Sequence, residues 1–366
     1  MEYRVNRRTG DKISVLGIGT STLPEADEKE AVNALRIAAE GGINYFDLAT
    51  AQCSCFGIFG KALSDIRKEL FYQIHFGADY TGGSYAWAPT LDKVKRSIDY
   101  QLKGLKTDYI DYGFIHCIDE QSDWDAYVKN GILDYIISLK NQGVVRHIGL
   151  SSHTPATVET ILDTGVVDML MFSINPAYDY ERGDEYAKGD VLRRAALYRR
   201  CEAEGVGISV MKPYCGGQLL SADLSPFGEA LTDYQCIRYA LDKPGVLTVL
   251  PGVGNVSDVE RLLGFLNASA DEQDYSAIAS FVPANAEGKC VYCNHCQPCP
   301  QGIDIALVNK YYYLANAGDM LAKDHYENLN VKADACIDCG HCRRRCPFGV
   351  DQPERMKEIA GYFKSI

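Results

Sequence analysis

The stretch LDKVKRSIDYQLKGLKTDYIDYGFIH, at residues 91–116, contains one copy of the repeating pattern of apolar residues from which the fold can be predicted. In its first half, Val94, Ile98 and Leu102 recur at the spacing that places them on one face of a helix. Its second half, Tyr109–His116, is a short apolar run that is typical of a buried strand. The stretch therefore predicts a helix that is followed directly by a strand.

The same alternation repeats from residue 15 to about residue 267, with amphipathic stretches such as Glu28–Gly41 between the apolar runs. Eight predicted strands over this length are typical of a (β/α)8 TIM barrel, an α/β fold, rather than of an open doubly wound sheet. In TIM barrels the chemistry takes place at the C-terminal ends of the strands. The predicted strands are Val15–Thr20, Tyr45–Ala49, Leu70–Gly77, Tyr109–His116, Val145–Ser152, Met169–Asn175, Gly207–Pro213 and Leu247–Val253.

Past residue 282 the composition changes to a dense run of Cys, Pro and Tyr, and eight of the 14 cysteines lie at positions 290–346. We therefore expect two domains, a barrel over residues 1–282 and a small metal-binding domain over residues 283–366. Within the second domain, one run reads Cys336-Ile-Asp-Cys339-Gly-His-Cys342-Arg-Arg-Arg-Cys346-Pro347. This C-x2-C-x2-C-x3-C-P spacing is typical of bacterial ferredoxins, whose thiolates hold [4Fe–4S] clusters.

A similar run precedes it, with a last spacer that is one residue shorter: Cys290-Val-Tyr-Cys293-Asn-His-Cys296-Gln-Pro-Cys299-Pro300. In two-cluster ferredoxins the fourth cysteine of each run binds the other cluster. We therefore expect two [4Fe–4S] clusters, one held by Cys290, Cys293, Cys296 and Cys346 and the other by Cys336, Cys339, Cys342 and Cys299. Paired C-x2-C units also suit two zinc sites, but the proline after the fourth cysteine of both runs favours the ferredoxin type.

The overall charge restricts the partners. A net charge of −12 and a pI near 5.1 argue against binding to nucleic acid or to an anionic membrane surface, since both would repel an acidic protein. The N-terminal stretch lacks the apolar core of a signal peptide, and no apolar run has the length of a membrane span. We expect a cytoplasmic protein with a small-molecule substrate and, because clusters are oxygen-sensitive, a role in anaerobic metabolism. The basic run Arg343–Arg345 is a candidate docking surface for an acidic electron carrier of the ferredoxin or flavodoxin type. The alternatives are that it favours a reduced, more negative cluster or that it is a solvated surface without such a role.

Several barrel segments carry a family resemblance, in particular Gly42-Ile-Asn-Tyr-Phe-Asp47, Gly149-Leu-Ser-Ser-His153, Met211-Lys-Pro213 and Leu250-Pro-Gly252. In order and spacing they resemble the aldo/keto reductases, and the whole chain resembles the ferredoxin-fused branch of that superfamily. The resemblance implies carbonyl reduction with a nicotinamide cofactor and a tetrad of Asp, Tyr, Lys and His at the barrel mouth.

Carried over by position, the resemblance implies catalytic roles for Asp47 and His116 but a degenerate tetrad. Gln52 occupies the position of the tyrosine and His75 that of the lysine. Because an amide has no acidic proton to give, His75 or His116 becomes the candidate acid. The resemblance also places NADP(H) binding at Ser151, Ser152, Lys212, Gly252, Asn255 and Arg261, although only Arg261 offers a cation near the phosphate-compatible loop.

Four further cysteines, Cys53, Cys55, Cys117 and Cys215, follow predicted strands. Cys53, Cys55 and Cys117 are candidate ligands of a third metal or iron–sulfur centre at the mouth. The alternative is that these residues are buried and inert thiols.

Together these features predict an iron–sulfur oxidoreductase that reduces a small organic substrate at the barrel mouth with electrons relayed by two clusters. A barrel that only transfers hydride from a nicotinamide has no need of such a relay. One alternative is reductive elimination, or reduction of a C=C or C–X bond, at the third centre. Another is a non-catalytic electron carrier or redox sensor built on an inactive barrel.

Overall fold

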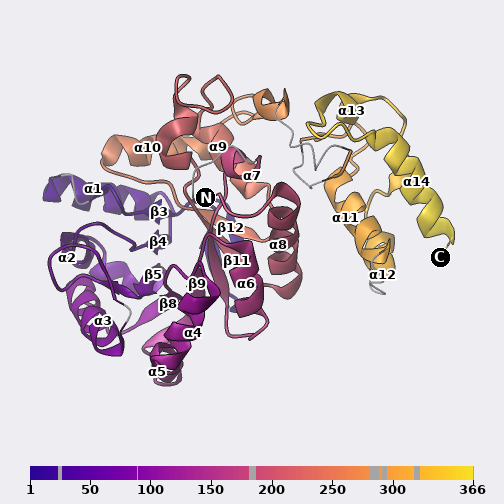
Figure 1. The fold of residues 1–366 in the computed structure, drawn as a ribbon. Coiled ribbons are helices and arrows are strands. Elements are labelled where there is room, and N and C mark those ends of the chain that lie inside the picture. Colours follow the sequence, from indigo (N-terminus) through magenta and orange to yellow (C-terminus); the bar gives the residue numbers. More distant parts are fainter. Residues whose placement is uncertain are drawn as a thin grey trace.

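A computed structural model of the chain describes residues 1–23, 27–88, 90–180, 187–280, 288–290, 295–316 and 322–365. All eight predicted strands are present, and they form one parallel sheet in the order β12-β11-β10-β9-β8-β5-β4-β3. Bridges from Leu16 to Val249 and from Gly19 to Gly252 bring the first strand to the last, so that the sheet is a nearly closed barrel, as predicted (Figure 1). The strands are β3 (Ile18–Gly19), β4 (Tyr45–Asp47), β5 (Phe71–Phe76), β8 (Ile110–Ile115), β9 (Val145–Ser151), β10 (Met169–Ser173), β11 (Gly207–Met211) and β12 (Val246–Val249).

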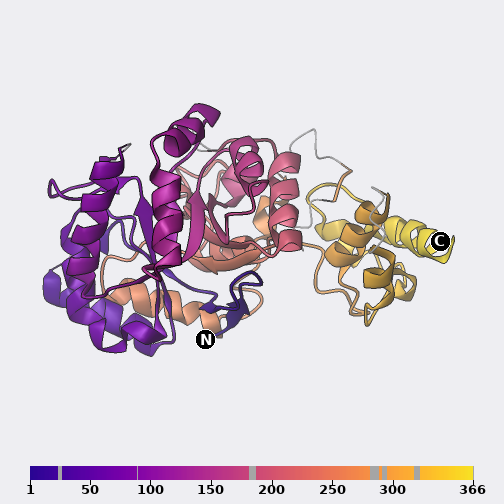
Figure 2. The same cartoon turned by 90° about the horizontal axis from the view of Figure 1, so that it is seen from below.

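Helices cover the outside of the barrel (Figures 1 and 2). In α3, the apolar face predicted from the sequence buries Val94 and Ile98, and the helix ends where Lys106 adopts a left-handed conformation. The helices of this layer are α1 (Glu28–Glu40), α2 (Ser54–Ala62), α3 (Leu91–Leu105), α4 (Gln121–Lys129), α5 (Ile132–Asn141), α6 (Pro155–Leu162), α7 (Pro176–Asp179), α8 (Val191–Glu204), α9 (Asp233–Leu241) and α10 (Val256–Gly264).

The inside of the barrel is filled by side chains rather than open. Tyr112 and Phe114 of β8 belong to a buried cluster that also contains Tyr45 and Met169. A Cβ atom at Gly149 of β9 would lie 2.4 Å from the ring of Phe114, so this position requires glycine. The interior is therefore a packed core rather than a channel.

Two hairpins that the sequence analysis did not predict lie at these ends. The hairpin of β1 (Tyr3–Val5) and β2 (Lys12–Ser14) lies at the end where the strands begin. The hairpin of β6 (Ala78–Asp79) and β7 (Ala86–Trp87) follows the C-terminal end of β5. Gly82 and Gly83 form its turn, and Gly83 has a φ of 97° that favours glycine.

The C-terminal segment forms a separate helical unit beside α8 (Figures 1 and 2). It contains α11 (Ile305–Asn316), α12 (Ala322–Glu327), α13 (His341–Arg345) and α14 (Gln352–Ser365). This unit has its own buried cluster, in which Val308, Ile359 and Phe363 are nearly inaccessible. The predicted boundary between residues 282 and 283 lies outside the described residues and stays a prediction.

The two units touch near the C-terminal ends of the barrel strands. Phe348 stacks on Tyr180, just after α7, with ring centroids 5.5 Å apart and an interplanar angle of 12°. Arg345 donates to the backbone carbonyl of His295 at 3.0 Å and lies 3.5 Å from the carboxylate of Asp274. These contacts hold the cysteine-rich loops against the rim from which α7 starts.

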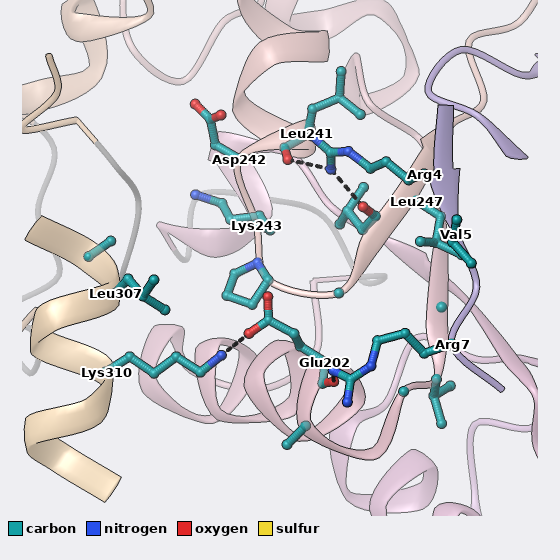
Figure 3. A pocket seen from close by; sticks show the side chains of 18 of the residues that line it. Arg4, Val5, Arg7, Glu202, Leu241, Asp242, Lys243, Leu247, Leu307 and Lys310 are labelled. Carbon is teal, nitrogen blue, oxygen red and sulfur yellow. Dashed lines mark hydrogen bonds and ion pairs between the residues drawn. The ribbon is translucent and has the colours of Figure 1, made fainter. Parts of the chain in front are cut away.

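A cleft between the two units lies at the other end of the strands (Figure 3). Two basic side chains that line the cleft are engaged by other protein groups. Lys310 of α11 pairs with Glu202 of α8. Arg4 donates to the backbone carbonyls of Leu241 and Val246, at 2.9 and 2.7 Å. The cleft is therefore part of the interface between the units. None of the described helices combines the length and hydrophobicity that crossing a bilayer requires.

Candidate active site and cluster ligands

Three of the predicted site residues form a hydrogen-bonded line at the C-terminal ends of neighbouring strands. Asp47 ends β4, His75 is the penultimate residue of β5, and His116 follows β8 directly. The Oδ1 atom of Asp47 lies 2.8 Å from Nε2 of His75, and Nδ1 of His75 lies 3.1 Å from Nδ1 of His116. Because the strands are adjacent in the sheet, residues far apart in the chain form one continuous line of proton-carrying groups.

Gln73 fixes the buried end of this line from inside the barrel. Its amide nitrogen donates to Oδ1 of Asp47 at 3.0 Å, and its amide oxygen accepts from the hydroxyl of Tyr45 at 2.6 Å. Asp47 and His75 are both almost completely buried. Tyr45 therefore orients the amide of Gln73, and that amide in turn holds the Asp47 carboxylate in the orientation in which it meets His75.

A residue that the sequence analysis missed lies at the other end of the line. The hydroxyl of Tyr85, in the β6–β7 hairpin, is 2.9 Å from Nε2 of His116. Trp87 of the same hairpin lies with its ring centroid 5.7 Å from that of His116. A Gly-Gly turn flanked by aromatic residues directly after a barrel strand was the available signal for this hairpin.

The hairpin is attached to the loop after β4. The backbone N–H of Tyr85 donates to the carbonyl of Ala51 at 3.0 Å, and Ser84 pairs with Gln52 in an antiparallel bridge. The side chain of Gln52 is exposed at this edge. The structure thus brings Tyr85 next to the position that the family resemblance assigns to a tyrosine.

Electrostatics favour neutral groups at the mouth. Burial, followed by the neighbouring His75 and His153, lowers the pKa of His116 well below the usual value of histidine. Burial, followed by the thiol of Cys117, raises the pKa of Tyr85. At neutral pH His116 is therefore an uncharged imidazole and Tyr85 an intact phenol.

In the C-terminal unit, four cysteines line one apolar cavity together with Ile303 and Met356. They are Cys299, Cys336, Cys339 and Cys342, the same four that the exchange rule of ferredoxins assigns to one cluster. This donor set fits a [4Fe–4S] cluster, because four thiolates and apolar walls are what such a cluster requires. Of the three arginines beside it, Arg343 pairs with Asp351 at 2.7 Å, and Arg345 lies 3.5 Å from the carboxylate of Asp274 on the barrel side. The docking surface for an electron carrier stays a prediction.

Two cysteines of the other group, Cys290 and Cys346, lie where the two units meet. Cys290 and Cys346 pack against the hydrophobic core of the barrel, whereas Cys293 lies outside the described residues. A histidine precedes the third cysteine of each run, and buried ring nitrogens of both, in His295 and in His341, lack a hydrogen-bond partner within the described part of the chain. The sulfides of bound clusters would offer acceptors for such nitrogens, which is a second sign that the site fits clusters.

The predicted third centre is not supported. The thiol of Cys53 is hydrogen-bonded to the hydroxyl of Tyr100. The thiol of Cys55 is hydrogen-bonded to the hydroxyls of Thr20 and Thr50. Burial raises the pKa of Cys55 to about 12 and that of Cys117 to about 11, so both are neutral thiols.

Within the described residues, the one metal-type group comprises Cys117, Asp119 and His153. The carboxylate of this group already accepts hydrogen bonds from neighbouring residues. Asp119 accepts from the backbone N–H of His153 at 2.6 Å, from its ring at 2.9 Å and from Ser152 at 3.2 Å. Cys215, Cys201 and Cys236 are buried among apolar residues, Cys215 at the start of a short 3-10 helix and the other two in α8 and α9.

The residues expected to bind NADP(H) fit that cofactor poorly at the start of α10. Asn255 caps this helix by accepting from Asp258, and the backbone N–H of Val256 donates to the carboxylate of Glu30 at 2.9 Å. The N–H of Gly254 donates to Asp258 at 3.0 Å. A nucleotide phosphate would find these donors occupied and would face carboxylates.

The remaining expected cofactor contacts also have other roles. Arg261 is paired with Asp233 at 2.8 Å and with Asp258 at 3.3 Å. Ser151 is buried, and the hydroxyl of Ser152 donates to Asp119 at 3.2 Å. Gly252 bridges to Gly19, and Lys212 has a positive φ of 54°. In this arrangement the expected contacts do not form a ready site for a nicotinamide nucleotide.

Residues 15–228 match the aldo/keto reductase family, and residues 289–351 match the 4Fe-4S dicluster domain. The chain is 27% identical over 294 residues to L-galactose dehydrogenase of Arabidopsis thaliana, covering 71% of this chain and 86% of the relative.

Two solved structures have the same fold. An aldo-keto reductase from Bacillus halodurans in its holo form superposes with a TM-score of 0.63 at 23% identity, over 78% of this chain and 97% of that one. An aldo-keto reductase from Klebsiella pneumoniae in complex with NADPH superposes with a TM-score of 0.56 at 17% identity, over the same shares of the two chains. The family match covers more than half of the chain, and it agrees with the eight-stranded barrel. This oxidoreductase therefore belongs to the aldo/keto reductase family, with a C-terminal 4Fe-4S dicluster domain added to the barrel.

Proposed function

We propose that this protein reduces the carbonyl group of a small, polyhydroxylated molecule at the barrel mouth, using electrons that enter through the dicluster domain. The observation that carries the proposal is the hydrogen-bonded line from Asp47 through His75 to His116, which runs from a buried carboxylate to the mouth. The similarity to an L-galactose dehydrogenase supports a sugar-like substrate.

In this proposal the line of side chains moves protons. Asp47 holds the buried end, His75 takes the place of the family's lysine, and His116 passes the proton toward the mouth. The amide of Gln52 hydrogen-bonds a substrate hydroxyl and orients the molecule. Exposed aromatic rings at the rim, such as that of Trp87, give the carbon face of a sugar a surface on which to pack.

The dicluster domain accounts for the electrons. Conversion of a C=O group to CH–OH takes two electrons and two protons, and the two clusters, when bound, supply single electrons. The cysteine-rich loops lie against the rim of the mouth, since Phe348 stacks on Tyr180 directly after α7. An external one-electron carrier of the ferredoxin or flavodoxin type is the proposed donor.

The test uses protein purified without oxygen, for which about eight iron atoms and eight sulfides per chain are expected. The protein is reduced with titanium(III) citrate in D2O and mixed with DL-glyceraldehyde, the smallest aldose. The proposal expects glycerol with deuterium on the new C–H bond. If none of the small aldoses tried is reduced and none reoxidises the protein, the chain is an electron carrier and the proposal is wrong.

A second arm tests the source of the electrons with NADPH that carries deuterium at C4 of the nicotinamide, in H2O. Deuterium in the product would show hydride transfer and would overturn the proposed route through the dicluster domain. The control is Cys339→Ala, which removes one proposed ligand at an exposed position. It should lose reduction driven by titanium(III) and leave any reduction driven by NADPH intact.

A further inference from the structure

The hydroxyl of Tyr85 completes the line of proton-carrying groups at its open end, 2.9 Å from Nε2 of His116. We propose that Tyr85 is the catalytic acid of this site and gives its phenolic proton to the oxygen of the substrate carbonyl. The inference rests on the proposed function and adds to it the group that touches the substrate.

The position of Tyr85 suits this role. Asp47 and His75 are almost fully buried, whereas 43% of Tyr85 is exposed, so the line leads from the interior to a group that a substrate can reach. The backbone pairing with Ala51 and the bridge from Ser84 to Gln52 fix the hairpin against the rim. The rings of Tyr85 and His116 lie with centroids 5.8 Å apart, which limits how far the phenol can move.

The neighbouring groups leave Tyr85 as the best proton donor. The amide of Gln52 cannot release a proton. His116 is kept neutral by burial, and its mouth-facing Nε2 atom is already engaged by the phenol. The thiol of Cys117 is directed to the carboxylate of Asp119 at 3.9 Å.

The line of hydrogen bonds has two consistent arrangements, which are related by the protonation state of His75. When His75 is neutral and donates to Asp47, its Nδ1 accepts from His116, and Nε2 of His116 accepts from the Tyr85 hydroxyl. When His75 carries a second proton, the line reverses: His75 donates to His116, and His116 donates to the oxygen of Tyr85. In the second arrangement the phenolic hydrogen is free to point at a substrate.

The proton balance follows from this second arrangement. The O–H bond of Tyr85 breaks as the O–H bond of the product alcohol forms. The carbonyl carbon receives two electrons, delivered one at a time by the donor of the proposed function, and its new C–H bond takes a proton from water. The phenolate then takes a proton from Nε2 of His116, which recovers one from Nδ1 of His75. Solvent returns the proton to the line after the product leaves.

The test compares Tyr85→Phe with the wild type in the reduction of DL-glyceraldehyde driven by titanium(III) citrate. The variant keeps the ring and loses only the acid, so kcat should fall by about 10²-fold or more while KM, iron content and the reduction of the protein stay unchanged. The matched control is Tyr100→Phe, which removes the hydroxyl of another partly exposed tyrosine of the barrel and should leave kcat unchanged.

An unchanged kcat in Tyr85→Phe, with an active wild type, would overturn the role of Tyr85 and leave the proposed function standing. A parallel rise in KM with kcat unchanged would make Tyr85 a binding residue and would also overturn it. A wild type that reduces no aldose would instead overturn the proposed function, and the role of Tyr85 with it.

Discussion

The two ends of the barrel use the same kinds of residue in different arrangements. At the mouth, one carboxylate, two histidines and a tyrosine form a line from Asp47 to Tyr85 that ends at an exposed phenol. At the opposite end, Asp11 accepts from Tyr112 at 2.6 Å and from His147 at 3.2 Å.

The opposite end is a closed network. His147 also faces Asp168 at 3.9 Å, and Lys140 pairs with that carboxylate at 2.8 Å. Lys140 thus supplies the opposite charge for Asp168, the Asp11 carboxylate is bound by Tyr112 and His147, and burial raises the pKa of Tyr112 far above its usual value. A closed network stabilises the fold, whereas an open line can exchange a proton with a ligand.

The largest expected effect comes from breaking the open line. His116→Gln keeps a polar side chain of similar size but cannot carry a proton along the line, so kcat for aldose reduction should fall by about 10²- to 10⁴-fold. The matched variant at the closed end is His147→Gln, which should leave kcat unchanged. Steady-state rates of the two variants compare the ends directly, and equal losses in both would contradict the distinction.

A closed network next to the mouth should show an effect on stability instead. Arg194 of α8 is completely buried and donates to Asp179 at 2.8 Å, and Tyr198 and Tyr239 donate to the same carboxylate. Arg194→Met leaves that carboxylate buried without its cation, so the free energy of unfolding should fall by about 3–5 kcal/mol.

Its neighbour on the same helix provides the control. Arg193 pairs with Glu159 at 2.8 Å on the surface, so Arg193→Met should cost at most about 1 kcal/mol. Urea denaturation can be followed by tryptophan fluorescence, because both tryptophans, Trp87 and Trp124, belong to the barrel. Similar losses in the two variants would show that burial of the ion pair is not what matters.

A smaller loss is expected at the closed end. Asp11→Asn keeps the shape of the side chain but weakens its bonds to His147 and Tyr112, which should lower the free energy of unfolding by about 1–3 kcal/mol. The rate of aldose reduction should not change. A loss of kcat without a loss of stability would mean that this end takes part in the reaction.

The smallest effect is a difference in pH dependence between the two ends. The pKa of His116 is lowered in the folded state, so on acidification the unfolded chain takes up this proton at a higher pH than the folded protein does. The stability that depends on a neutral His116 is therefore fully present above about pH 6.5 and is lost as the pH falls below that value. Burial raises the pKa of Asp11, but hydrogen bonds from His147, Tyr112 and Thr9 outweigh it and lower the pKa. The stability from Asp11 is therefore present above about pH 3.9 and is lost as the pH falls through its folded value.

Urea denaturation at a series of pH values separates these two contributions. His116→Gln should remove part of the loss that begins near pH 6.5, and Asp11→Asn should remove part of the loss in stronger acid. The groups that face His116 are His75, His153, Asp119 and Tyr85, and none of them is altered by the substitution at Asp11. The opposite assignment of the two pH windows would contradict the electrostatic description of both ends.

The fold was predictable because its signals are local. Each strand of the barrel is a short apolar run, and the structure shortens rather than moves them, as in β8, where the predicted Tyr109–His116 becomes Ile110–Ile115. The cysteine runs were recognisable for the same reason, since the ligands of one loop are only three residues apart.

The mouth was only partly predictable because it depends on tertiary contacts. Asp47, His75 and His116 were predicted through the family resemblance, which placed them at the ends of predicted strands that the sheet brings together. Tyr85 was missed because its position depends on pairing between the hairpin and the loop at Ala51, which no periodic pattern signals. The three rim cysteines were misleading, since their proximity to strand ends does not determine where a thiol points.

The role of the open line is tested most directly by asking whether a substrate reoxidises the reduced protein through it. Protein carrying two electrons per chain is mixed rapidly with DL-glyceraldehyde without oxygen, and the visible absorbance of the clusters is followed for the wild type, His116→Gln and Asp11→Asn. We expect substrate-dependent reoxidation at the same rate in the wild type and in Asp11→Asn, and at a rate lowered by about 10²-fold or more in His116→Gln. Equal rates in all three proteins, or rates that do not depend on the aldose, would contradict it.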